Sequence, residues 1–334
     1  MRILLTGCAG FIGFHTAKTL LDEGNEVVGV DNLNHYYDPA LKESRLVQLI
    51  SYKNFTYLKV DICDHEALNL CLKPFKINRV IHLAAQAGVR HSISNPRDYL
   101  NNNIVGFFNI LEYSRSISAE HLTYASTSSA YGANTLLPFS EKNHADHPIQ
   151  FYAATKRSNE LMAHSYSCIY GLPTSGLRFF TVYGPWGRPD MALYKFTKNI
   201  ISGEEIEIFN HGKHIRDFTY VEDIVDGITK VSNKPSTGNA EWDSLNPDPS
   251  SSFAPFEVYN LGNSEPVQLM AYVNMIEDYL GKKAQIKFLP LQQGDVENTI
   301  SDISKVSKLG YLPATNVKAG VKKFLDWYVD YYSI

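Results

Sequence analysis

A glycine-rich turn near the amino terminus restricts this chain to few folds. Residues 1–6 read as a short apolar strand, and Gly7, Gly10 and Gly13 follow it at intervals of three. Glycine permits a tight turn and lets the backbone approach a diphosphate, whose negative charge then lies at the amino end of the next helix. The pattern predicts a strand–loop–helix unit that binds a dinucleotide within a parallel α/β sheet.

An acidic residue follows the second expected strand at the distance that such a unit requires. We expect a helix over 11–23 and a strand over 26–30, which ends at Asp31, 18 residues after Gly13. A carboxylate at this place holds the adenosine ribose hydroxyls and repels a 2′-phosphate. The sequence therefore predicts NAD, and not NADP, as the cofactor.

Strand patterns and helical patterns then alternate along the chain. Near-continuous apolar strands that alternate with helices indicate a parallel sheet covered on both faces, which is a doubly wound, Rossmann-like fold. We expect the strands over 55–60, 79–84, 121–125 and 173–179, and the helices over 64–72, 96–116 and 151–170.

A smaller α/β lobe is expected in the carboxyl-terminal part of the chain. Residues 234–255 are rich in Ser, Pro, Asn and Asp, which is typical of a loop, and we read this segment as an insertion between lobes. Strands are expected over 257–260 and 285–289, and helices over 270–280 and 317–332. We predict an NAD-binding domain of residues 1–182, with returns at about 216–233 and 257–266, and a discontinuous substrate lobe of residues 183–215, 234–256 and 267–334.

Composition excludes several classes of function. The net charge of -4 and the pI near 6.3 give no basic surface for nucleic acid. No apolar run approaches the roughly 20 residues of a membrane span, and the first strand leaves no room for a signal peptide, so we expect a cytoplasmic protein. His82 is expected to be a core residue. The cysteines have no metal-site spacing, so we expect no metal and reduced thiols at Cys8, Cys63, Cys71 and Cys168.

Tyr152 and Lys156 stand four residues apart in the helix expected over 151–170. Side chains at this spacing lie on one face of a helix, so a phenol and an ammonium group converge on one small volume. A free tyrosine has a pKa near ~10, and a fixed positive charge lowers that pKa because it favours the phenolate. The pair therefore predicts a proton-transfer site.

Hydroxyl side chains follow the expected strand that precedes this helix. Thr127, Ser128 and Ser129 lie at the carboxyl edge of the sheet, where doubly wound sheets bind their ligands. A hydroxyl group here can donate a hydrogen bond to an oxygen whose proton Tyr152 removes. With Lys156, these groups are suited to one hydride transfer.

Taken together, these segments resemble the extended short-chain dehydrogenase/reductases of the NAD-dependent epimerase/dehydratase family, along essentially the whole chain. The resemblance implies that Arg216 grips a UDP diphosphate, that Phe209 borders the uracil and that Asp295 contacts the ribose. Besides the glycines and the Tyr/Lys pair, it implies NAD contacts at Phe11, Ile12, Asp31, Asn32, Asp61, Ile62, Leu83, Ala84, Ala85, Asn102 and Phe180.

Within that family the nearest resemblance is to UDP-glucuronate 4-epimerases of bacterial capsule type, whose products enter capsule or lipopolysaccharide biosynthesis. It rests on residues 30–38, 85–92 and 178–192. Two positions depart from the usual pattern: Gln293 stands where many relatives have proline, and the loop at 34–35 reads Asn-His.

The resemblance implies a redox cycle at C4 of the sugar. Tyr152, as phenolate, takes the proton of the 4-hydroxyl group while hydride passes to the nicotinamide, and Lys156 lowers the tyrosine pKa and holds the nicotinamide ribose. Thr127 hydrogen-bonds the 4-oxygen. The 4-keto sugar then turns over and takes the hydride back.

The same resemblance implies which residues bind the carboxylate of a hexuronate. Arg188 offers two donors, and Ser128, Ser129 and Thr181 add hydroxyl groups. Arg90 is the alternative ligand, either for this carboxylate or for the diphosphate.

Other activities share parts of this pattern. A UDP-glucose or UDP-N-acetylglucosamine 4-epimerase differs only in the pocket. A 4,6-dehydratase or a UDP-glucuronate decarboxylase carries an acid where this chain has Ser128 or Ser129, and a non-catalytic NAD-binding regulator typically lacks the tyrosine or the lysine. The family also implies a homodimer through the helices expected over 96–116 and 151–170.

Overall fold

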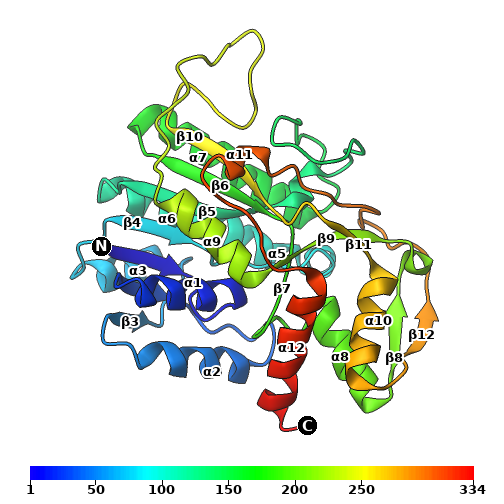
Figure 1. Ribbon diagram of the computed structural model, residues 1–334. Coiled ribbons are helices and arrows are strands. Elements are labelled where there is room, and N and C mark those ends of the chain that lie inside the picture. The colour runs from blue at the N-terminus through cyan, green and yellow to red at the C-terminus, as the bar shows by residue number, and fades with distance from the viewer.

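The computed structural model describes residues 1–334 and is built on a seven-stranded parallel sheet (Figure 1). Its strands are β1 (Arg2–Thr6), β2 (Glu26–Val30), β3 (Phe55–Leu58), β4 (Arg79–His82), β5 (His121–Thr127), β6 (Thr174–Phe179) and β10 (Phe256–Leu261). They lie in the order β10-β6-β5-β4-β1-β2-β3. The doubly wound sheet is thus confirmed, and its order reverses between β1 and β4, where such a sheet opens a crevice for ligands.

Helices cover both faces of this sheet. The apolar residues of α1, α2 and α9 join one buried cluster, and those of α3, α6 and α7 join the other. The helices of this part of the chain are α1 (Phe11–Asp22), α2 (Pro39–Ile50), α3 (His65–Leu72), α4 (His91–Ser94), α5 (Pro96–Tyr99), α6 (Gly106–Ser116), α7 (Phe151–Tyr170), α9 (Val221–Ser232) and α11 (Ser304–Ser307), with the 3₁₀ turn η2 (Ser128–Tyr131).

Smaller sheets and three further helices lie to one side of the large sheet (Figure 1). They comprise the sheet β11-β9-β7 (Pro266–Gln268, Ile215–Tyr220 and Thr181–Tyr183), the pair β8 and β12 (Glu205–Ile208 and Gln285–Phe288), the turn η3 (Asn210–Gly212) and the helices α8 (Ala192–Ser202), α10 (Leu269–Leu280) and α12 (Val317–Tyr332).

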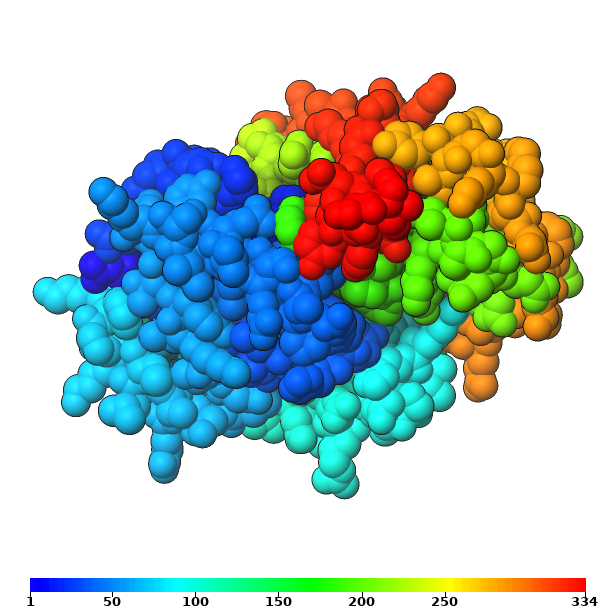
Figure 2. Space-filling view, turned by 90° about the horizontal axis from the view of Figure 1, so that it is seen from below, coloured from blue at the N-terminus to red at the C-terminus, as the bar shows by residue number.

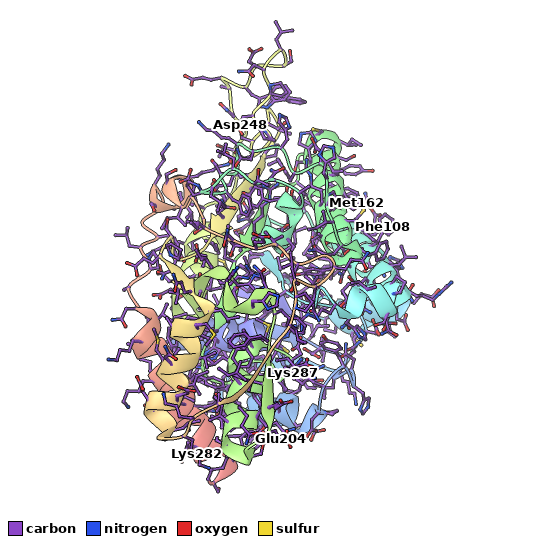
Figure 3. All side chains as sticks on the ribbon, turned by 90° about the vertical axis from the view of Figure 1, so that its right-hand side faces the viewer. Phe108, Met162, Glu204, Asp248, Lys282 and Lys287 are labelled. Carbon is purple, nitrogen blue, oxygen red and sulfur yellow. The ribbon has the colours of Figure 1, made fainter.

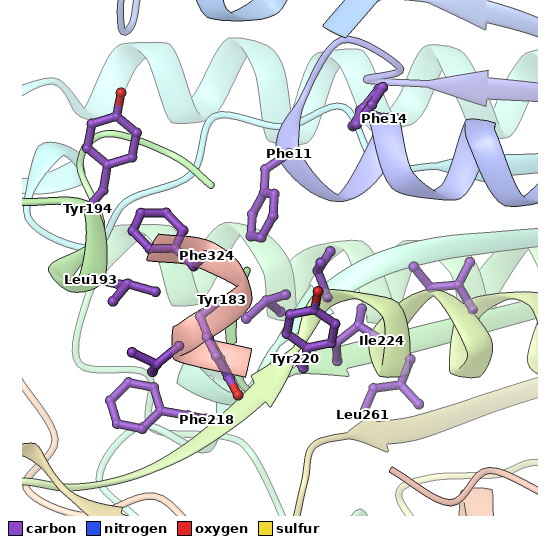
Figure 4. Packing of buried hydrophobic residues seen from close by; sticks show 14 of the residues in the cluster. Phe11, Phe14, Tyr183, Leu193, Tyr194, Phe218, Tyr220, Ile224, Leu261 and Phe324 are labelled. Carbon is purple, nitrogen blue, oxygen red and sulfur yellow. The ribbon is translucent and has the colours of Figure 1, made fainter. Parts of the chain in front are cut away.

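One apolar core joins the large sheet to these elements. Figure 4 shows Phe11 and Phe14 of α1 on one side and Phe218, Phe324 and Tyr194 on the other. In Figure 2 the carboxyl-terminal helix α12 (red) lies between the amino-terminal half (blue) and the smaller lobe (green and orange). This packing fixes the lobe against the sheet edge at which the strands end.

The expected elements are present, with ends that differ by at most two residues, but one helix is interrupted. The helix expected over 96–116 consists of α5, the π-helical turn η1 (Leu100–Val105) and α6. A π-turn inserts an extra residue and re-aims the side chains beyond it. Here it brings Asn103 against Gln86, whose backbone N–H donates to Asn103 Oδ1 at 2.8 Å.

Helix α2 was not anticipated from the sequence, although its start signals are local. The Asp38 carboxylate accepts a hydrogen bond from Ala40 N at 2.9 Å, and Pro39 occupies the first helical turn. This is the usual chemistry of a helix amino terminus. Helices α8 and α9 and strands β7, β8, β9 and β11 were likewise not predicted.

The loop at 234–255 contacts the large sheet, and its expected place in the smaller lobe stays a prediction. Ser236 Oγ donates to Thr174 O of β6 at 3.0 Å, and Val258 N of β10 donates to Ser250 O at 2.8 Å. The loop projects above this sheet edge in Figure 1, and Asp248 marks it in Figure 3. The rest of the predicted division into lobes stays a prediction.

His82 is a core residue, as predicted. It is buried, and its Nδ1 lies 2.8 Å from Thr6 Oγ1 of the neighbouring strand. The cysteines are all free thiols. None of the helices is both long and apolar enough to cross a membrane.

Candidate active site

A cavity of about 380 Å³ opens where β1 and β4 end, at the point of order reversal. Of the residues predicted to contact NAD, only Asp61 does not line it; Asp61 instead accepts a hydrogen bond from Asn32 Nδ2 at 3.0 Å. The predicted residues in the lining are Gly7, Gly10, Phe11, Ile12, Gly13, Asp31, Asn32, Ile62, Leu83, Ala84, Ala85, Asn102, Tyr152, Lys156 and Phe180.

The glycine loop is shaped to receive a diphosphate. Gly7 has a positive φ of 75°, and a Cβ there would lie 2.7 Å from Ala84 N, while a Cβ at Gly13 would strike Gly7 O. These two glycines allow the loop to pack closely against β4 and α1. Gly10 gives α1 no side-chain cap, so the first amides of the helix border the cavity, where an anion can accept from them.

Asp31 is a buried acid at the end of β2. Its Oδ1 accepts from Leu33 N at 2.9 Å and its Oδ2 from Ala9 N at 3.1 Å. Burial raises the pKa of Asp31, whereas these backbone hydrogen bonds and the charge of Lys42 lower it. Each oxygen keeps acceptor capacity toward the cavity, so the residue fits the pair of ribose hydroxyls predicted for it.

The structure brings Tyr152, Lys156 and Thr127 to one wall of the cavity. Burial raises the pKa of Tyr152, and a side-chain hydrogen bond with Thr127 and the charge of Arg188 act in the opposite direction. The sequence analysis assigned this effect to Lys156 and missed Arg188. Burial lowers the pKa of Lys156 to about 7, against the raising effect of Glu160.

The predicted carboxylate ligands lie in the same cavity as Tyr152. Ser128, Ser129, Thr181 and Arg188 all contribute to its lining. Arg188 Nε and Nη2 donate to Asp190 at 2.9 and 2.5 Å. These bonds use two of the roughly five N–H groups of a guanidinium, so the predicted two-donor contact with a carboxylate stays a prediction. Asp190 was not predicted as a site residue, although an acid two residues after an arginine in a tight loop indicates a local ion pair.

The predicted uridine contacts form a second group, which does not line this cavity. Arg90 Nη2 lies 3.5 Å from Asp295 Oδ2, and its guanidinium lies over the Phe209 ring, 4.4 Å from the ring centre. Arg216 Nη1 donates to Glu297 O at 2.6 Å. Burial lowers the pKa of Arg216 to about 10, and Asp295 acts against this effect. The structure thus brings together four residues that are scattered along the sequence.

Comparison with known proteins identifies the family. A model of the "NAD dependent epimerase/dehydratase family" matches residues 3–262. The chain belongs to this family.

Members of this family resemble the chain along its whole length. Protein CapI of Staphylococcus aureus is 53% identical over 99% of each chain. A probable UDP-glucuronate 4-epimerase of Rhizobium meliloti is 47% identical over 99% of this chain and 98% of its own. The UDP-glucuronic acid 4-epimerase of Bacillus cereus, solved in complex with UDP-glucuronic acid and NAD, is 32% identical, with a TM-score of 0.87 and coverage of 99% of this chain and 100% of its own.

One part of the cavity wall was not predicted from the sequence. The lining also includes Asn34, Tyr36, Tyr37 and Lys42, from the loop after β2 and from α2. Arg45 of α2 is fully buried, and its hydrogen bonds link the segments that form this wall. Its Nη1 donates to Ala9 O and to Tyr37 Oη, each at 2.8 Å, and its Nη2 donates to Trp186 O at 2.6 Å. The place of these residues in the wall depends on the contacts of α2, a helix that was not predicted.

Proposed function

We propose that this chain is an NAD-dependent UDP-glucuronate 4-epimerase, which interconverts UDP-glucuronate and UDP-galacturonate. The observation that carries the proposal is the meeting of Tyr152, Thr127 and Arg188 on a cavity that is also lined by the glycine loop. The names of the relatives support the same substrate. The family is NAD dependent.

The chain offers matching groups for each part of the cofactor. The loop from Gly7 to Gly13 would hold the diphosphate, Asp31 the adenosine ribose, and Lys156 the nicotinamide ribose. NAD, when bound, accepts a hydride from the sugar and later returns it.

Tyr152 is the proposed general base. Its Oη takes the proton of the sugar 4-hydroxyl group during oxidation and gives it back during reduction. The phenol must ionise to do this, and the two groups that lower its pKa, Thr127 and Arg188, both border the sugar site. Thr127, which lines the same cavity, would donate its hydroxyl group to the 4-oxygen.

Asp31 is the one acid that lines the cavity, and the proposal assigns it to the cofactor. Ser128 and Ser129 offer hydroxyl groups to a hexuronate carboxylate, with Thr181 from β7, but they cannot carry the protons that elimination or decarboxylation requires. The 4-keto intermediate is therefore expected to survive until the hydride returns. Arg188 keeps the two N–H groups of Nη1 and one of Nη2 for the carboxylate, because Asp190 accepts only one N–H from Nε and one from Nη2.

The Arg188–Asp190 pair also supports a second candidate. Asp190 neutralises the cation that a uronate would seek, and a neutral pocket suits UDP-glucose. A UDP-glucose 4-epimerase is therefore the alternative. A solved UDP-glucose 4-epimerase of Thermotoga maritima, 28% identical with a TM-score of 0.84, shares the fold.

We further propose that the second group holds UDP. Arg216 and Arg90 supply positive charge for the diphosphate, Phe209 a flat face for uracil, and Asp295 an acceptor for ribose hydroxyls. Arg90 now covers the Phe209 ring, so it has to move when the base stacks there.

We also propose a cytoplasmic homodimer. Helices α6 and α7 pack side by side, and Figure 3 shows Phe108 and Met162 on the same edge of the molecule. Phe108 is 45% exposed and Leu161 is 57% exposed, which leaves apolar surface for a second copy. A monomeric mass in light scattering would count against the dimer.

The deciding experiment is incubation of the purified protein with UDP-glucuronate, without added NAD, with UDP-glucose in parallel. Chromatography then separates UDP-galacturonate, UDP-xylose and 4-keto sugars. UDP-galacturonate as the sole product supports the proposal. Turnover of UDP-glucose alone favours the alternative, and UDP-xylose would contradict the argument from Ser128 and Ser129.

A further inference from the structure

A fully buried carboxylate lies behind the proposed catalytic wall. Glu160 of α7 accepts four hydrogen bonds from side chains: from Ser126 Oγ at 2.6 Å, from Arg178 Nε and Nη2 at 2.9 and 2.8 Å, and from Arg157 Nη1 at 2.9 Å. Arg178 is also buried and lies over the Tyr131 ring. Such a pair is costly to bury, and replacement by apolar residues is often neutral or stabilising. Its presence here therefore suggests a role beyond stability.

One of these contacts, and the position of Glu160 on α7, connect the carboxylate with the active site. Glu160 follows Lys156 by one helical turn, so the two side chains lie on the same face of α7. Ser126 lines the cavity, precedes Thr127 and lies opposite Arg178 in the register of β5 and β6. The carboxylate thus joins α7, which carries Tyr152 and Lys156, to β6 and to β5, which ends at Thr127.

We infer that Glu160 is a positioning residue of the active site, which keeps Lys156 in its ammonium form and fixes the end of β5 from which Thr127 projects. The inference deepens the proposed function and rests on it. The effect of the Glu160 charge on Lys156 can nevertheless be measured in the protein without substrate.

The other charges near Lys156 do not replace Glu160. His82 of β4 is neutral, because burial and the charge of Lys156 hold its pKa well below the usual range. Tyr152 and Tyr124 are phenols whose pKa values burial raises, so they too are neutral. Arg157 and Arg178 are cations and do not favour an ammonium group.

Glu160 itself remains ionised at any working pH. Burial raises its pKa, but Arg178, Arg157 and Ser126 together lower it to about 2. It is the charge that raises the Lys156 pKa against burial.

The test is a pH titration of Lys156 by NMR, in protein labelled with [6-¹³C]lysine. The resonance is assigned by its loss in Lys156→Met. In Glu160→Gln we expect the Lys156 midpoint to fall by about one pH unit or more. The alkaline limb of the pH profile of kcat/KM should move to lower pH by the same amount, because Lys156 then loses its proton at a lower pH.

A second variant protects the test against misfolding. Glu160→Gln alone leaves two arginines without their anion, whereas Glu160→Gln with Arg178→Met removes the buried charge pair together. Its Lys156 midpoint should fall as well. Arg157→Gln is the matched control, since it takes one cation from the same carboxylate, is mostly buried at 16% exposure and leaves Glu160 charged. Its midpoint should not fall.

Ser126→Ala tests the second half of the inference, because it removes one 2.6 Å hydrogen bond and keeps the ion pair. We expect kcat to fall about fivefold or more with the KM little changed and the melting temperature nearly kept. An unchanged Lys156 midpoint in both Glu160 variants would overturn the charge role, and an unchanged kcat in Ser126→Ala would overturn the role in placing Thr127. A midpoint that shifts in a protein without epimerase activity would contradict the proposed function and leave the charge role standing.

Discussion

The guanidinium of Arg188 is held by the carboxylate of Asp190 through two hydrogen bonds, of 2.9 and 2.5 Å. Tyr36 Oη donates a third bond to the same carboxylate at 3.1 Å. Burial lowers the pKa of Arg188, but the charge of Asp190 raises this pKa by more, so the guanidinium stays protonated. The cavity proposed to hold the sugar is therefore lined by an arginine whose charge is largely balanced by Asp190.

Asp190→Asn should increase the preference for a uronate. The amide cannot balance the charge of Arg188, so the guanidinium becomes a stronger ligand for a substrate carboxylate. A charged hydrogen bond contributes about 1.5–3 kcal/mol, so the ratio of kcat/KM for UDP-glucuronate over UDP-glucose should rise roughly tenfold or more. Steady-state kinetics on both substrates measure this ratio. Tyr36→Phe, which removes only the third bond, serves as the control, and a ratio that falls in Asp190→Asn would contradict the assignment of Arg188.

Tyr152→Phe should abolish most turnover and leave the cofactor in place. The substitution removes the oxygen that accepts the proton and keeps the ring packed against Tyr99, 5.9 Å away between ring centres. General-base catalysis contributes about 10²–10⁴-fold, so kcat should fall by that factor. NAD content after purification, measured by absorbance on denaturation, should match the unaltered protein. Activity within a few-fold of the original would exclude Tyr152 as the base.

Lys156→Met should stabilise the protein below neutral pH. The pKa of Lys156 falls from 10.5 in the unfolded chain to about 7 in the folded protein. The unfolded chain therefore binds more protons between these values, and the stability contributed by this group is present above pH 10.5 and lost as the pH falls to about 7. The melting temperature of Lys156→Met should exceed that of the unaltered protein most at pH 6 and least near pH 10. A constant difference across this range would show that burial does not shift the Lys156 pKa.

Asp31→Ser should weaken NAD binding and reduce the discrimination against NADP. The carboxylate accepts from Ala9 and Leu33 and is the acid nearest the predicted ribose site, while Lys42 lines the same wall. Without the negative charge, Lys42 becomes available to a 2′-phosphate. We expect the affinity for NAD to fall about tenfold or more and the ratio of the two Kd values to move toward NADP. Calorimetric titration of cofactor-depleted protein measures both. Glu43→Gln, which removes an exposed acid of α2 that does not line the cavity, is the control. Equal losses for both cofactors would argue that Asp31 supports only the loop.

Local spacing along the chain was enough to predict one part of the site. The glycines at 7, 10 and 13 follow one strand and open one helix, and Tyr152 and Lys156 share one helical face. Such relations follow from backbone geometry alone, so they can be read without a fold. The doubly wound sheet followed in the same way, from the alternation of apolar strands and helical segments.

Contacts between groups that are distant in the sequence depend on the folded arrangement of the chain. Tyr36 and Asp190 are 154 residues apart, Arg45 joins loops before and after it, and Glu160 collects donors from two strands and its own helix. These contacts set the charge of the site, because a buried group responds to its nearest partners and to the loss of water more than to its sequence neighbours. The sequence could name Tyr152 as the base, but burial, Thr127 and Arg188 determine how readily it ionises.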